Sequence, residues 1–300
     1  MALTFDPNVQ DVLSLEDFVD YVDRCIEVDD PDSLCECAPA LKSLLNNRSL
    51  ISDVIARELR SWRDFQKGNA YVATTLILAR TQRFFIRANM WLPDRPRSRA
   101  HADNTIYGLT HDHNFTFMTG GFHGSGYTTE IYELDTHAVR GLSGERVELE
   151  FLERTTLPEG KIMLYRAMQD VHRQSRPDEL SISINLVVPT HTKTRPQYFF
   201  NLDRGEITHT EYPERGRALA LFKLAQYAGD KKTHSLLGDI ATTSANPRLR
   251  AVAYETLCEC GPEIAAAVSE RVLRDPDRHV RATAKRATPK DLASKGHLSQ

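Results

Sequence analysis

Apolar residues recur at helical spacing over the first part of the chain, between residues 14 and 67. The first series contains Leu15, Phe18, Val19, Val22, Cys25 and Ile26. Asp-Asp-Pro at 29–31 ends it, because proline cannot continue a helix. A second series runs from Leu41 to Leu59. The pattern predicts an N-terminal helical segment over residues 1–70, which would cover an open side of the next domain or form a dimer contact.

The spacing changes to that of strands near residue 71. Segments rich in β-branched and aromatic residues follow one another, with glycine-containing turns between them. Their sequences are YVATTLILAR, RFFIRANMWLP, TIYGLTH, NFTFMTG, YTTEIYELD, RVELEFLERTTL, KIMLYRAM, LSISINLVV and QYFFNLD. Many short strands without intervening helices favour an antiparallel sandwich or barrel. We therefore predict an α+β protein with a central antiparallel β-barrel over residues 71–207.

Helical spacing returns over residues 208–300. Two segments there resemble each other, one starting at Asn246 and one at Asp275. Arg250 and Arg281 each follow an apolar residue and precede alanine, 31 positions apart. The pattern resembles HEAT-type helical repeats. It predicts a helical-repeat segment that either packs on the barrel or offers a docking surface to a protein partner.

The composition is that of a soluble globular protein, with 41% apolar and 26% charged residues in a chain of 300. A net charge of −3 gives no reason to expect nucleic acid or an anionic membrane surface as a partner. No apolar run is long enough for a transmembrane helix, and the N-terminus does not resemble a secretory signal. Five cysteines, an odd number, fit reduced thiols, so we expect a cytoplasmic protein.

The sharpest chemical signal is the triplet His111-Asp-His113. Alternate residues of a strand point to the same face, so both imidazoles would face the interior and could chelate one metal ion. Asp112 would then point out of the barrel. A third ligand must come from another strand, and His172 qualifies. His123, in a predicted turn, is a weaker alternative.

These residues resemble the motifs of the cupin superfamily, over about residues 71–205. Cupins carry His-x-His on one strand, then a Pro-x-Gly turn and a later histidine, which here are His111 and His113, Pro158-Glu-Gly160 and His172. Ordinary cupins add a glutamate shortly after the second histidine, but apolar residues stand there in this chain. The remaining set is similar to that of cysteine-dioxygenase-like cupins. This resemblance implies Fe(II) with dioxygen as co-substrate, and Zn, Mn or Ni are alternative metals.

Four further residues are candidates for catalysis. A hairpin around His123 would place Glu133 opposite the His-x-His segment and Glu130 on the other face, but a slip of one residue would reverse this. Tyr165 and Arg166 lie on the strand that leads to His172, and Arg154 lies on the preceding strand. Strand alternation allows only one of Tyr165 and Arg166 to face inward. An inward arginine could hold a substrate carboxylate.

The resemblance implies a mononuclear non-haem iron oxygenase, either a dioxygenase or a hydroxylase. Its substrate would be an amino acid or a small natural-product intermediate. The predicted barrel contains no cysteine, so the cysteine–tyrosine crosslink of mammalian cysteine dioxygenases cannot form. Two alternatives remain: a Zn- or Mn-dependent cupin isomerase or lyase, and a non-catalytic binding or regulatory protein whose helical repeats recruit a partner.

Overall fold

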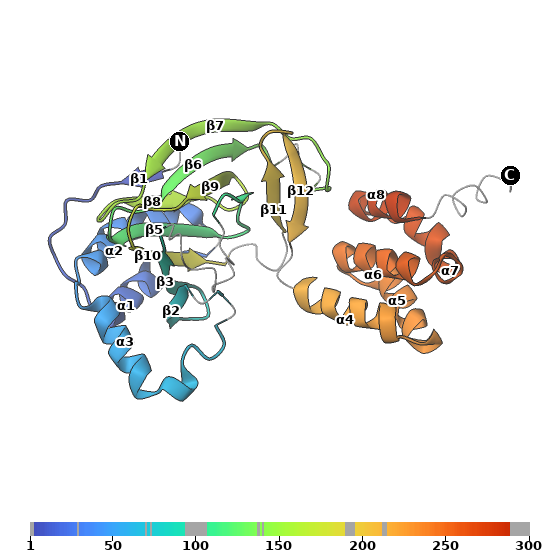
Figure 1. Ribbon diagram of the computed structural model, residues 1–300, viewed down its shortest axis with the longest axis horizontal. Helices are drawn as coiled ribbons and strands as arrows, with labels where there is room; N and C mark the ends of the chain where they lie inside the picture. The colour runs from blue at the N-terminus through green and yellow to red at the C-terminus, as the bar shows by residue number, and fades with distance from the viewer. Residues whose placement is uncertain are drawn as a thin grey trace. The chain divides into compact units, whose positions relative to one another are not determined.

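The structure is a computed structural model that describes residues 3–28, 30–69, 71–72, 74–93, 107–136, 139, 141–189, 196–211 and 215–288. The chain divides into two compact units. One comprises residues 1–139 and 143–210, and the other comprises 140–142 and 211–300. The first unit combines helices and strands, whereas the second contains helices (Figure 1). Within the described residues, no helix is both long and apolar enough to cross a membrane.

The first unit contains two six-stranded sheets. The first sheet has the order β1 (Leu3–Phe5), β8 (Ile162–Tyr165), β5 (Thr116–His123), β10 (Ser181–Val188), β3 (Phe85–Trp91) and β2 (Thr75–Arg80). The second has the order β12 (Glu206–Glu211), β11 (Gln197–Asn201), β4 (Thr110–His111), β9 (Asp170–Ser175), β6 (Thr128–Leu134) and β7 (Leu149–Thr156). Strand pairing within the two sheets is antiparallel wherever the register is defined. Among the described residues we find two open sheets, and no closed barrel of the predicted kind.

Both faces of the first sheet are buried, since its central strands β5 and β10 are buried at nearly every position. Met118 and Leu186 point to a core shared with the N-terminal helices. Their sequence neighbours Phe117 and Val187 point the other way, to a core shared with Ile131 of the second sheet. The helices are α1 (Leu15–Cys25), α2 (Ala38–Leu45) and α3 (Leu50–Arg60), with 3-10 segments at Pro31–Cys37 and Trp62–Asp64. They therefore cover the outer face of the first sheet (Figure 1).

Two side chains occupy the free edge of β2 and help to keep this sheet open. The Gln66 side-chain amide donates from Nε2 to the Ile77 carbonyl (3.2 Å), and its Oε1 accepts from the Ile77 N–H (2.7 Å). Asn69 Nδ2 donates to the Thr75 carbonyl (2.8 Å). These are backbone groups that another strand would need for pairing. The edge of the sheet thus ends on side chains instead of closing into a barrel.

The second unit contains α4 (Arg215–Ala228), α5 (Lys231–Thr243), α6 (Pro247–Cys260), α7 (Pro262–Leu273) and α8 (Arg278–Ala287). The two related arginines make the same local contact. Arg250 donates to the Ser244 carbonyl (2.6 Å) and Arg281 to the Asp275 carbonyl (2.6 Å), each six residues upstream. Arg250 also forms a buried, bidentate ion pair with the Asp275 carboxylate. The similarity of the two segments therefore reflects a shared way of fixing the start of a helix.

Candidate metal centre

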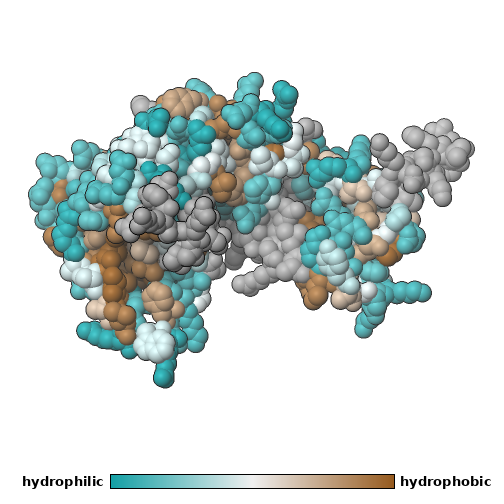
Figure 2. All heavy atoms as spheres, viewed as in Figure 1, coloured by the Kyte–Doolittle hydropathy of each residue, from teal (hydrophilic) through white to brown (hydrophobic). Residues whose placement is uncertain are grey.

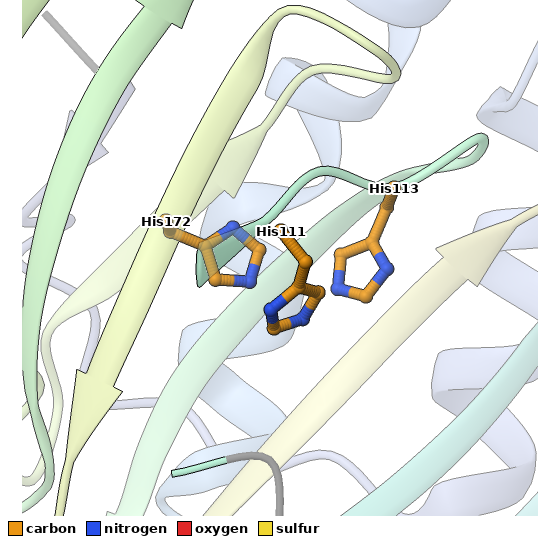
Figure 3. Close-up of side chains that lie close together, drawn as sticks. All are labelled: His111, His113 and His172. Carbon is orange, nitrogen blue, oxygen red and sulfur yellow. The ribbon is translucent and has the colours of Figure 1, made fainter. Parts of the chain in front are cut away.

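Three histidines from two distant segments of the chain, His111 with His113 and His172, meet in the interior of the first unit. His111 ends β4 and lies directly opposite His172 of β9 in antiparallel register. His113 follows β4 by two residues. The candidate ligand atoms of the three side chains all lie within 4.8 Å of one another. The rings point toward a common space (Figure 3), with centroids 4.5 to 5.0 Å apart.

Asp112, between the first two histidines, fixes the path of this segment. Its backbone N–H donates to the Tyr198 carbonyl (3.1 Å), and its Oδ1 accepts from the Tyr198 N–H (2.6 Å). The prediction had this side chain outside the barrel, but it is fully buried, and burial raises the pKa of its carboxyl to about 7. The His113 carbonyl accepts from the Met168 N–H (2.6 Å). Contacts on both sides of the triplet therefore hold the imidazoles in place.

The three imidazoles are neutral at pH 7. His111 and His172 are only 1% and 0% exposed. Burial, which disfavours the charged form, lowers the pKa of His111 to about 4 and the pKa values of His113 and His172 well below the usual range. Neutral imidazoles are the form that binds metal ions.

The ring nitrogens are left with the capacity to bind an ion. His111 Nδ1 lies 3.1 Å from the Leu109 carbonyl, so Nδ1 carries the proton and Nε2 keeps a lone pair. Three further ring nitrogens have no hydrogen-bond partner within the described part of the chain: both nitrogens of His172 and Nδ1 of His113. Unsatisfied buried polar atoms are rare because each costs free energy. A divalent transition-metal ion would take one nitrogen from each ring, so the residues present fit such an ion.

Aromatic rings surround the histidines. The Phe115 ring stacks on His113, with centroids 4.5 Å apart. Tyr165 packs edge-on against His172 at 4.8 Å and stacks on Phe117 at 4.8 Å. These contacts restrict the rotation of the imidazoles and keep water from their flanks.

Sequence reasoning missed a buried arginine in the same interior. Arg87 on β3 is only 8% exposed, and its guanidinium lies 4.8 Å from the Tyr71 ring centroid and 5.8 Å from that of Phe115. Among the described residues, no carboxylate pairs with it and its Nε has no hydrogen-bond partner. Its positive charge contributes to the lowered pKa of His111, His113 and His172. An arginine alternating with apolar residues on a buried strand was the available signal.

Of the two residues between which the sequence could not choose, Tyr165 faces the histidines. It is 1% exposed, and its hydroxyl donates to Thr129 Oγ1 at 3.4 Å. Arg166 instead forms ion pairs with Asp170 (2.6 Å) and Glu133 (3.0 Å). Its charge is already compensated by two carboxylates.

The other candidates lie apart from the imidazole cluster. Arg154 is exposed on β7, opposite Glu130 of β6, whose carboxylate accepts from Arg173 Nε (3.0 Å). Glu133 lies opposite Asp170 in the sheet, not opposite His113, because β6 pairs with β7 and β9. His123 is exposed at the end of β5, 3.5 Å from Glu159.

No family profile and no curated protein sequence matches this chain. Several solved structures resemble part of it. DMSP lyases match at 13% identity (TM-score 0.24), over 38% of this chain and 46% of theirs. A hydroquinone 1,2-dioxygenase from Sphingomonas matches at 12% (TM-score 0.26), over 40% and 68%. A double-stranded β-helix protein from Klebsiella pneumoniae matches at 8% (TM-score 0.26), over 46% and 93%.

The chain thus spans less than half the length of the DMSP lyase that it matches. These likenesses are partial, and their sequence identities lie between 8% and 13%.

Proposed function

We propose that this chain is a metal-dependent oxygenase in which His111, His113 and His172 hold a single Fe(II) ion. The observation that carries the proposal is the convergence of three neutral imidazoles in the interior, with His113 Nδ1 and both ring nitrogens of His172 lacking a hydrogen-bond partner among the described residues. An Fe(II) ion held by these three side chains would supply the activation of dioxygen beside a substrate. The protein's own residues supply the rest of the site.

The charge balance of the centre favours an anionic substrate. The three histidine ligands are neutral, and Arg87 adds a positive charge that no carboxylate of the described residues compensates. A divalent ion beside it would raise the buried positive charge further, which is costly without a counter-ion. A substrate carboxylate between Arg87 and the metal would supply that negative charge. This supports an amino acid or a small carboxylate-bearing natural-product intermediate as substrate.

Tyr165 supplies a neutral hydroxyl beside the ligand set. Burial raises its pKa well above the usual range, so the hydroxyl stays protonated. The pKa of the neighbouring Tyr127 is raised to about 12 for the same reason. Both hydroxyls therefore keep their proton, and Tyr165 could turn its own from Thr129 Oγ1 toward a substrate oxygen. The aromatic walls exclude water from this region, which strengthens such contacts.

The test is metal analysis of the purified protein combined with oxygen-uptake assays. We expect near-stoichiometric iron after reconstitution with Fe(II). His172→Ala should lose it, whereas His123→Ala, at an exposed histidine, should retain it. Dioxygen consumption should require both iron and an anionic substrate from a panel of amino acids and small carboxylates.

Two outcomes would contradict the proposal. Turnover that persists without dioxygen and requires Zn or Mn would indicate the isomerase or lyase alternative. A protein that binds no metal, and whose stability and metal content are the same after His172→Ala, would instead be a non-catalytic binding protein.

A further inference from the structure

Helix α4, the first helix of the second unit, presents an apolar face to solvent. Leu221, Leu224 and Tyr227 lie on successive turns and are 63%, 62% and 81% exposed. Phe222, on the opposite side of the helix, is 5% exposed and belongs to the core of the unit. Leu236 of α5, which packs against α4, is 54% exposed. Apolar atoms are visible at the surface where α4 lies (Figure 2).

The two ends of the helical layer differ in chemistry. Helix α6 packs against both α4 and α8, so α4 and α8 are the terminal helices of that layer. Helix α8 exposes Arg278, Lys285 and Arg286, as expected for a terminal helix that faces water. Terminal elements of stacked helices need a polar outer face for solubility. The described face of α4 lacks one, so it is the end of the layer that requires a partner.

We propose that the α4 face formed by Leu221, Leu224 and Tyr227 binds the same face of a second copy of this chain about a two-fold axis. Such an interface is self-complementary, so it closes after two copies. The basic exposed surface of α8 offers no apolar match for α4, which argues against head-to-tail stacking. This inference goes beyond the proposed oxygenase activity and does not depend on the metal centre.

The exposed area is sufficient for a specific contact. The four apolar side chains expose on the order of 500 Å², so two copies would bury about 1,000 Å², the size at which specific interfaces begin. Large aromatic and aliphatic side chains at the centre of an interface carry most of its energy, and Tyr227 is the most exposed of the four. On one flank of α4, Lys223 is paired with Glu259 (2.7 Å), so its charge is compensated locally.

The experiment measures the mass of the full-length chain in solution by light scattering or sedimentation, over a wide micromolar range. We expect a dimer. Leu224→Asp should raise its dissociation constant at least about tenfold, because it places a carboxylate at the centre of the interface. Leu59→Asp makes the same change at an apolar residue of α3 that is 68% exposed, and it should leave the dimer intact.

A wild-type chain that is monomeric throughout this range would overturn the proposal. So would a dimer with the same dissociation constant in the Leu224→Asp variant. A monomer that expands on Leu224→Asp would mean that the face binds another part of its own chain, which also contradicts the proposal. Tyr227→Gln, a milder change, provides the same test if Leu224→Asp alters the circular dichroism spectrum.

Discussion

At the scale of single residues, Arg87 destabilises the fold by its buried charge, and that same charge is the one proposed to bind a substrate carboxylate. A buried guanidinium without a carboxylate partner loses its hydration without full compensation. Burial accordingly lowers its pKa. Such a residue is retained at a cost in stability when it binds a ligand. A substitution at Arg87 should therefore raise the stability of the protein and weaken its binding of a ligand.

We expect Arg87→Met to raise the stability of the metal-free protein by about 1–3 kcal/mol, because it removes an uncompensated buried charge. The same variant should lose the thermal stabilisation that carboxylate ligands give the iron-loaded protein. Both effects are measured by thermal unfolding with and without a panel of amino acids.

Arg173→Met is the matched control, because Arg173 is paired with Glu130 and its side chain is 40% exposed. It should keep the response to carboxylates. A loss of stability in Arg87→Met together with an unchanged carboxylate response would show that this arginine has a purely structural role.

The buried histidines predict how the stability of the metal-free protein depends on pH. An unfolded imidazole has a pKa near 6.5, whereas folded His111 has a pKa of about 4. The folded chain therefore binds fewer protons in this window, and stability is lost as the pH falls from about 6.5 to about 4. The loss is about 3 kcal/mol for His111 alone. Denaturant titrations of chelator-treated protein at several pH values measure it.

Asp112 acts in the opposite direction. Its raised pKa of about 7 makes the folded chain take up a proton before the unfolded chain, so its contribution to stability grows as the pH falls. The three histidines lower the stability as the pH falls by more than the one aspartate raises it, so the net effect is a loss of stability. Asp112→Asn keeps an oxygen for the Tyr198 N–H and removes the opposing term. We expect a steeper loss of stability in this variant, and a shallower one would contradict the assignment.

At the scale of elements, two glycines with nearly the same backbone angle differ in their surroundings. Gly126, in the turn between β5 and β6, has φ +79°, and a Cβ there would lie 1.9 Å from the Leu157 carbonyl oxygen. Gly144 has φ +78° and no atom within 4 Å of such a Cβ. Gly144→Ala should cost about 1 kcal/mol from backbone strain alone. Gly126→Ala should cost at least about 2 kcal/mol more, because backbone must move. Urea unfolding of the two variants measures the difference, and equal costs would refute the close approach.

The alternation of apolar and polar residues predicted most strands of this fold. It failed where strands are short or polar: β12, with the sequence EITHTE, and β9, which carries His172. The local pattern of residues does not show which strands pair. Because β9 was not predicted, the sequence could not show whether Tyr165 and His172 point to the same face of the sheet. For the same reason, the pairing of β6 with β9 could not be predicted. This pairing places Ile131 opposite His172 and Glu133 opposite Asp170.

The candidate site was predictable where chemistry is concentrated in short motifs. His111 and His113 stand two residues apart, so strand spacing alone predicted that they share a face. His172 was predicted from its place after the Pro158-Glu-Gly160 turn and from the resemblance to cupins, whereas its position opposite His111 depends on a strand pairing that the sequence does not show. Arg87 could not be found in this way, because its significance depends on the absence of a carboxylate nearby in space. The chain's histidines at 101, 137 and 191 lie outside the described residues.

At the scale of the whole molecule, the division into two units predicts that each can be destabilised alone. Asp275→Ala leaves the buried Arg250 unpaired, and breaking a buried ion pair costs about 3–5 kcal/mol. In calorimetry, we expect the unfolding temperature of the second unit to fall. Iron binding by His111, His113 and His172 should be unchanged. Glu270→Gln, which breaks an exposed pair with Arg274, should change neither. A fall in iron content with Asp275→Ala would mean that the units are coupled.

The amide of Gln66 has a consequence for the behaviour of the protein at high concentration. An open sheet can recruit strands from other molecules and grow into aggregates. The Gln66 amide pairs with both the N–H and the carbonyl of Ile77, as a neighbouring strand would. It has no backbone beyond this pair to which a strand from another molecule could add. Solubility at this edge thus depends on two side chains, Gln66 and, beside it, Asn69, which occupies the Thr75 carbonyl.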